Sequence, residues 1–198
     1  MGRMVGLAAG LIAFAATAAA AQYREITQSG PFRHDGSRTV FPEKVGNYER
    51  GRIVRYEDPA GEDVSVGYHA RTDSGPIILT EYVYPAPAPS ATLTRESACQ
   101  AEFDVSKAAI EKYGDSRKLG EPAAPAVAGI PPRLTHQASY SLSMVINGAP
   151  QTLQSDLLLY CYVGGNWFVK YRSSSPPGTD SRSPLSQFVA TGPWPGRK

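Results

Sequence analysis

Two ionisable residues occupy positions where the neighbouring sequence is apolar. His136 falls in phase with the apolar residues of the alternating segment 134–146, and Glu81 stands among the apolar residues of 77–83. A buried carboxylate is costly unless it is paired, and an imidazolium would be a natural partner for it. A glutamate and a histidine in contact could act as general acid and general base. His136 and Glu81 are therefore the candidate catalytic residues of a small hydrolase.

A second interpretation separates these two residues. If the strand 76–84 faces its core with Ile78, Tyr82 and Tyr84, then Glu81 lies at the surface because successive side chains of a strand alternate. His136, near the end of its strand, is then half-buried and has no contact with Glu81. A pair that serves structure alone is the third possibility.

Five aromatic residues fall on three strands that we expect to share one sheet. Aromatic rings with polar tips are common in sites that recognise peptides or glycans. They are also common in ordinary cross-strand packing, because tyrosine and tryptophan favour strands. The candidate binding residues are Tyr82, Tyr84, Tyr160, Tyr162 and Trp167.

The motifs of well-known enzyme and metal sites are absent from the sequence. It contains no H-E-x-x-H, G-x-S-x-G, P-loop or G-x-G-x-x-G pattern. Its three histidines are scattered and lack the spacing of a zinc site. We therefore expect no cofactor and no metal. The formal net charge of +2 gives no electrostatic reason to expect nucleic acid binding.

The first 21 residues have the pattern of a signal peptide. Arg3 precedes an uncharged apolar stretch, 4–16, and the alanines 19–21 provide a cleavage site before Gln22. The stretch is short and rich in alanine and glycine for a membrane-spanning helix. A retained N-terminal anchor is the alternative. We expect export to the periplasm or the extracellular space, with no stable membrane insertion after cleavage.

Cys99 and Cys161 are the only cysteines in the 198 residues. Cys99 lies on the inward side of a predicted helix, and Cys161 lies on the inward side of a predicted strand. A disulfide between them is the first interpretation, because an exported protein meets an oxidising compartment. Two buried free thiols are the alternative. Neither cysteine lies in a C-x-x-C motif or beside a histidine, which argues against a redox or nucleophilic role.

The remaining sequence divides into two parts. Residues 22–39 are polar and rich in turn-forming residues, which predicts an irregular N-terminal segment, and residues 40–198 predict a single α+β domain. The element order is β-β-β-α-β-β-β-α, an antiparallel sheet with helices packed on it. Asn147-Gly148 predicts a tight hairpin. The predicted strands are 52–57, 64–71, 76–84, 134–146, 151–163 and 167–172, with a long helix at 94–113, a loop at 115–132 and a short helix that begins near 183.

This order of elements resembles the PsbP/DcrB-like sandwich of small exported or accessory proteins. Several short segments are also similar to secreted bacterial proteins without a known role. The resemblance covers roughly residues 40–195 and implies an architecture and a binding or accessory role, but no catalytic residue. The segments that carry it are Phe41-Pro42, Val66-Gly67-Tyr68, Tyr82-Val83-Tyr84, Gly165 to Arg172, Phe188 and Trp194-Pro195.

These features favour an exported, monomeric cell-envelope binding or accessory protein, whose partner is an envelope protein, a peptide or a glycan. The alternative is a small periplasmic hydrolase that uses His136 and Glu81. A deep pocket lined by both residues would favour the hydrolase. A solid core with an exposed aromatic patch would favour the binding protein.

Overall fold

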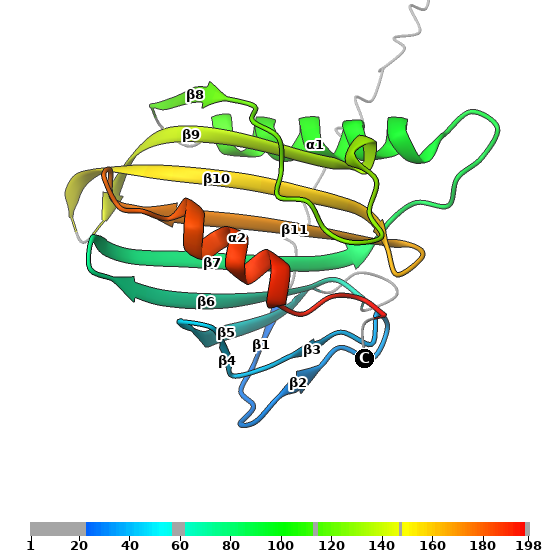
Figure 1. The fold of residues 1–198 in the computed structure, drawn as a ribbon, viewed down its shortest axis with the longest axis horizontal. Helices are drawn as coiled ribbons and strands as arrows, with labels where there is room; N and C mark the ends of the chain where they lie inside the picture. Colours follow the sequence, from blue (N-terminus) through cyan, green and yellow to red (C-terminus); the bar gives the residue numbers. More distant parts are fainter. Residues whose placement is uncertain (1–22, 57–61, 113–114, 147, 197–198) are drawn as a thin grey trace, which may run out of the picture.

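The computed structural model of the protein describes residues 23–56, 62–112, 115–146 and 148–196 (Figure 1). The predicted signal peptide, its cleavage point before Gln22, and Asn147 of the predicted hairpin lie outside these residues. Within them, the chain is a sheet-rich α+β fold with an antiparallel sheet and two helices longer than one turn. The coarse fold class predicted from the sequence is therefore confirmed.

Within the described residues, nine strands form one antiparallel sheet in the order β1-β5-β6-β7-β11-β10-β9-β8, with β4 paired to β5. Two short strands, β2 (Phe32–Arg33) and β3 (Val40–Phe41), form a separate pair. The strands of the large sheet are β1 (Tyr23–Ile26), β4 (Lys44–Val45), β5 (Tyr48–Tyr56), β6 (Val64–Thr72), β7 (Gly75–Pro85), β8 (Ser116–Gly120), β9 (Thr135–Ile146), β10 (Ala149–Val163) and β11 (Trp167–Ser175).

Two meanders make up the centre of this sheet. The strands β5, β6 and β7 form the first and β9, β10 and β11 the second, and the two meet through the antiparallel pair β7–β11. In that pair Tyr171 lies opposite Glu81. Strands far apart in the sequence are therefore neighbours at the middle of the sheet, where side chains of both meanders share one core.

Each face of the sheet carries one helix (Figure 1). The helix α1 (Arg95–Glu111) packs on the face that we call the α1 face, and α2 (Arg182–Thr191) packs on the opposite, α2 face. Alternate residues of β10 point to the two sides: Leu157 and Leu159 join the core under α1, and Leu158 joins the core under α2. The domain is thus a three-layer structure with two separate cores.

Two edge strands lie in segments that the sequence does not predict as strands. β1 occupies part of the segment 22–39 predicted to be irregular, and β8 occupies part of the predicted loop 115–132. Most of their side chains are exposed, so neither strand has the apolar alternation on which such a prediction depends. Backbone pairing with β5 and with β9 holds them in the sheet.

β9 and β10 are consecutive antiparallel strands, joined where the sequence predicts a tight hairpin, and Gly148 is the described residue of that turn. Ile146 pairs with Ala149 across it, and Gly148 has a φ of +79°. Glycine adopts this conformation without steric cost, whereas a β-branched residue does not. We expect Gly148→Val to lower the free energy of unfolding by about 1–2 kcal/mol in chemical denaturation. The control is Gly120→Val, at an edge-strand glycine without a positive φ, and equal losses in the two variants would contradict the prediction.

Candidate ligand-binding site

Glu81 lies in the core on the α2 face of the sheet. Its side chain is 0% exposed, whereas Ile78 is 62% exposed, so the interpretation that placed Glu81 at the surface is wrong. The phase that β7 adopts buries the aliphatic side chains of Ile77, Leu79 and Val83. Each such burial contributes about 1.5–3 kcal/mol, and together they outweigh the cost of enclosing one carboxyl group.

The carboxyl of Glu81 has one hydrogen-bond partner among the described residues. The hydroxyl of Tyr171, on the neighbouring strand, donates to its Oε1 at 3.3 Å, and its Oε2 has none. Burial raises the pKa of Glu81 well above its ordinary value, which favours the uncharged form. Because the side chain is fully enclosed, a substrate does not reach it in this conformation.

His136 lies on the opposite, α1 face of the sheet. It sits across from Leu159, and its ring stacks on Phe103 of α1 with the ring centres 4.8 Å apart. Its Nε2 is buried and has no hydrogen-bond partner among the described residues. Burial, helped by the nearby Lys107, lowers the pKa of His136. The structure does not bring His136 and Glu81 together, so they form no acid–base pair.

Tyr82 and Tyr84 belong to a polar cluster under α1 that the sequence analysis missed. The ammonium of Lys170 lies 5.2 and 4.9 Å from the centres of their rings. The same ammonium lies 3.2 Å from the Oγ of Ser106 and 3.4 Å from a carboxylate oxygen of Glu102. The Tyr84 hydroxyl donates to that carboxylate at 2.6 Å. These residues lie on β7, α1 and β11, and no motif in the sequence links the three elements.

A serine next to a lysine is a combination that can act as nucleophile and base. Here Ser106 is 6% exposed, and its hydroxyl donates to Glu102 in the same helix. The lysine, the serine and the carboxylate satisfy one another under the helix. We therefore interpret the cluster as the structural anchor of α1 on the sheet.

The other candidate aromatic residues are divided between the two faces. Tyr160 is 0% exposed in the core of the α2 face. Trp167 packs edge-on against His34, with ring centres 5.6 Å apart. Tyr162 lines a pocket near the end of the sheet. The five candidate aromatic residues do not form a single surface. Tyr162 is the one among them that lines this pocket.

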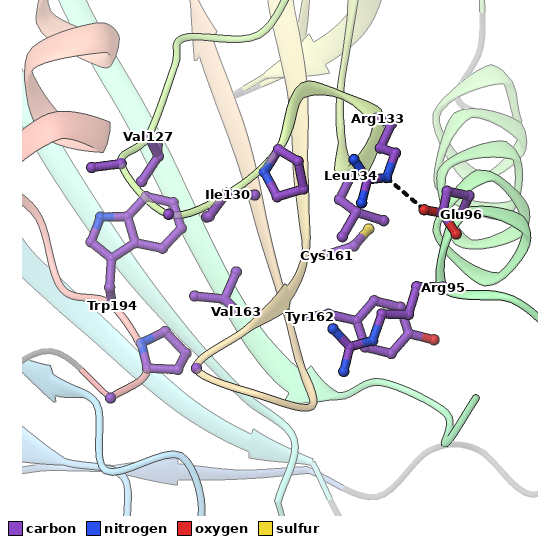
Figure 2. Close-up of a pocket in the computed structure, with 16 residues that line it drawn as sticks. Arg95, Glu96, Val127, Ile130, Arg133, Leu134, Cys161, Tyr162, Val163 and Trp194 are labelled. Carbon is purple, nitrogen blue, oxygen red and sulfur yellow. Dashed lines mark hydrogen bonds and ion pairs between the residues drawn. The ribbon is translucent and has the colours of Figure 1, made fainter.

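This pocket has a volume of about 360 Å³ and lies where β10 turns toward β11 (Figure 2). We call it the Arg95 pocket. Four segments far apart in the sequence form its walls: the first turn of α1 (95–96), the loop 127–134, the end of β10 with the following turn (161–164), and the C-terminal tail (194–196). Its volume falls within the range of about 300–1,000 Å³ that is usual for small-molecule sites.

A β-bulge turns Tyr162 toward this pocket. By alternation Tyr162 should share the face of Tyr160, but the register with β11 shifts between Tyr160 and Val163. Tyr162 takes a φ of +58°, and its ring joins the α1-face core beside Phe168. Its hydroxyl donates to the carbonyl of Pro87 at 3.0 Å. Such a backbone conformation costs about 1–3 kcal/mol in a residue with a side chain, and strain of this kind gathers at functional sites.

Arg95 and Arg133 supply the positive charge of the pocket. The guanidinium of Arg95 lies over the Tyr162 ring, 5.1 Å from its centre, and forms no ion pair with a carboxylate of the described residues. Arg133 is paired with Glu96, Nε to Oε1 at 2.7 Å, and this hydrogen bond is the main reason that the pKa of Glu96 is lowered. Arg95 therefore remains available to an anion.

The disulfide between Cys99 and Cys161 holds the charged end of the pocket together, and it confirms the pairing predicted from the sequence. The two Cα atoms are 5.8 Å apart. Cys99 follows Arg95 by one helical turn, and Cys161 directly precedes Tyr162. Residues four apart share one side of a helix. The covalent link therefore fixes the helix that carries Arg95 to the strand that carries Tyr162, the two residues whose side chains are in contact.

The opposite end of the pocket is apolar. In Figure 2, Val127, Ile130, Val163 and Trp194 surround this end, away from the two arginines. The indole N–H of Trp194 donates to the carbonyl of Val189 at 2.9 Å, which fixes the ring against the domain. The pocket thus has a charged end and an apolar end within one cavity.

The tail that carries Trp194 is held by close backbone packing. Gly164 has a φ of +56°, and a Cβ at this position would lie 2.7 Å from the carbonyl oxygen of Pro195. A larger residue would displace the tail from the β10–β11 turn. Glycine at position 164 is therefore required for this wall of the pocket.

Neither a cluster of metal-binding side chains nor a membrane-spanning helix is present in the described part of the chain. These residues contain no group of three or more histidine, cysteine, aspartate or glutamate side chains placed to hold a metal ion. Among the same residues, no helix is long and apolar enough to cross a membrane.

Comparison with known proteins identifies no family for this chain. No protein-family model and no curated protein matches it. Among solved structures, it is similar to LpqN of Mycobacterium tuberculosis, which is described as involved in cell envelope biogenesis. The identity is 13%, the TM-score is 0.39, and the match covers 87% of this chain and 92% of LpqN. A likeness at this level carries no argument about function.

Proposed function

We propose that the protein is an exported binding protein of the cell envelope that holds a small ligand in the Arg95 pocket. The observation that carries this proposal is the guanidinium of Arg95. It lines a cavity of about 360 Å³, lies over the Tyr162 ring and forms no ion pair with a carboxylate of the described residues. An arginine oriented by an aromatic ring and left unpaired is suited to bind an anionic group.

Two further features support a binding role. The bulge holds Tyr162 in a strained backbone conformation, and this conformation places the Tyr162 ring next to the guanidinium of Arg95. The disulfide connects the two elements that carry this pair, so the site is organised before a ligand arrives. Preorganisation of this kind increases affinity because less conformational freedom is lost on binding.

The compartment and the architecture are part of the same proposal. The apolar segment 4–16 with alanines before Gln22, together with a disulfide, supports export to the periplasm or the extracellular space. We infer a monomer with a signal peptide and a PsbP/DcrB-like architecture. The architecture is supported by the succession of two three-stranded meanders, each followed by a helix.

The proposal is tested by asking whether the pocket retains a compound from its own compartment. The protein, immobilised as the full chain recovered from the exporting cell, is incubated with small-molecule extracts of the envelope. Bound compounds are then eluted and identified by mass spectrometry. We expect at least one compound to be enriched on the wild type about tenfold over Arg95→Ala, since one charge-assisted hydrogen bond contributes about 1.5–3 kcal/mol.

Arg117→Ala is the matched control for this experiment. Arg117 is an exposed arginine on the edge strand β8 and does not line the pocket. The control variant should retain the same compounds as the wild type. If no compound distinguishes the wild type from Arg95→Ala, the pocket is not a binding site and the proposal is wrong.

A further inference from the structure

We infer that the ligand of the Arg95 pocket is a small amphiphilic carboxylate, with its anionic head at Arg95 and its apolar part against Val163 and Trp194. This inference rests on the proposed function and adds to it the chemical class of the ligand. The ionised side chains, the geometry of the guanidinium and the apolar wall each support it.

The ionised side chains of the pocket favour a ligand with one negative charge. Three line the cavity: Arg95, Arg133 and Glu96. Their charges sum to +1: Glu96 pairs with Arg133 at 2.7 Å and also interacts with the charge of Arg95, so one of the two positive charges is not neutralised. A monoanion makes the pocket neutral. A dianion would bring a second negative charge toward Glu96, and this repulsion selects against it.

The geometry of Arg95 favours a carboxylate as the head. The ring of Tyr162 lies on one side of the guanidinium, with its centre 5.1 Å from the guanidinium carbon, so a ligand approaches from the sides that the ring leaves open. The planar fork of an arginine matches the two oxygens of a carboxylate with two parallel hydrogen bonds. The Tyr162 hydroxyl already donates to Pro87, so Arg95 supplies the contacts that set the charge of the ligand.

The far end of the pocket favours an apolar group on the same molecule. Val127, Ile130, Val163 and Trp194 form this end, and none of them carries a charge (Figure 2). A second ionised group at the far end of the ligand would lose its hydration without gaining a partner. An aliphatic group gains affinity from each methylene that it buries there, against a wall whose Val127 and Val163 are 7% exposed and whose Trp194 is 2% exposed.

The class is tested by titrating ¹⁵N-labelled full chain with octanoate and following the indole N–H signals of its two tryptophans. Trp194 lines the pocket and Trp167 does not, so Trp167 is an internal reference. We expect octanoate to shift the Trp194 signal and not the Trp167 signal. Octanol and octylammonium, which keep the chain but change the charge, should bind about tenfold more weakly or less. Octyl phosphate, with its second charge, should not bind more tightly than octanoate.

Two variants separate the head from the apolar part. Arg95→Gln should weaken octanoate about tenfold and leave octanol unchanged, because the charge-assisted hydrogen bonds are lost. Val127→Ser should weaken both, because it makes the apolar wall polar. Arg117→Gln should change neither. The amide spectrum of each variant shows whether it is folded, and N-acetylleucine, tested beside octanoate, shows whether a peptide carboxyl terminus or an acyl chain is the better source of the carboxylate.

The outcomes separate the ligand class from the proposed function. If octanoate and N-acetylleucine leave the Trp194 signal unchanged above about 5 mM, a range in which even weak sites with millimolar Kd are occupied, the carboxylate class is wrong. The class is also wrong if octanol equals octanoate, or if octyl phosphate binds more tightly. In each case a compound enriched from the envelope extract on the wild type over Arg95→Ala would leave the proposed function standing.

Discussion

The protein without its disulfide is expected to lose about 4 kcal/mol of its free energy of unfolding. Cys99 and Cys161 are 62 residues apart in the sequence. The cross-link closes a long loop in the unfolded chain and removes conformational entropy from it, so breaking the link stabilises the unfolded state. The free energy of unfolding of a typical domain is roughly 5–15 kcal/mol, so this loss would be a large part of it.

The measurement compares the oxidised wild type with the same chain after reduction, by chemical denaturation followed with far-ultraviolet circular dichroism. The double variant Cys99→Ser, Cys161→Ser is the control, because a reductant should leave its unfolding curve unchanged. The reduced wild type should also bind a pocket ligand more weakly, since the helix of Arg95 and the strand of Tyr162 are no longer linked. Equal denaturation midpoints before and after reduction would show that the link contributes nothing to stability.

A second large effect is expected from the buried carboxyl of Glu81. Burial raises its pKa in the folded protein well above the ordinary value of 4.5. At a pH between these two values the unfolded chain releases the proton and the folded protein keeps it. The folded state then binds one more proton than the unfolded state, so the stability of the wild type falls by about 1.4 kcal/mol per pH unit. Below both pKa values the carboxyl is neutral in both states, and its full contribution to stability is present.

Glu81→Gln isolates this effect because its amide does not titrate. We expect the variant to gain stability relative to the wild type as the pH rises from about 4 to about 8, measured by urea denaturation at each pH. Asp73→Asn, in the exposed turn between β6 and β7, controls for the loss of one carboxylate at the surface. A constant difference between the wild type and Glu81→Gln over this range would mean that the Glu81 carboxyl ionises equally in both states.

The parts of the fold that follow local rules could be predicted from the sequence. The alternation of 134–146 corresponds to β9, and Thr94 caps α1 by accepting a hydrogen bond from the Ser97 amide at 3.1 Å. The inward positions of Cys99 and Cys161 predicted the disulfide. Each of these inferences starts from a local period or a local cap, although the disulfide itself joins residues 62 apart.

The face of Glu81 and the direction of Tyr162 could not be predicted in the same way. Either alternate set of β7 residues contains large side chains that could face the core. Which set is buried depends on the core that the neighbouring strands β6 and β11 form with β7. Tyr162 follows the alternation of β10 in the sequence, but the bulge moves its ring to the other face. A bulge is set by the partner strand and has no separate signal in the strand that carries it.

The sequence alone determined the types of the central strands and of the two helices, the antiparallel meanders, the covalent link and the expectation of export, because each depends on local periodicity, composition or cysteine count; it did not determine the edge strands β1 and β8. The tertiary structure decided the site. Arg95, Tyr162, Arg133 and Trp194 lie in four segments that meet only when the helix, the sheet end, the loop and the tail pack together. The spacing of these residues in the sequence does not predict that they lie close together, because side-chain packing and strand register across the whole sheet set the distances between the segments.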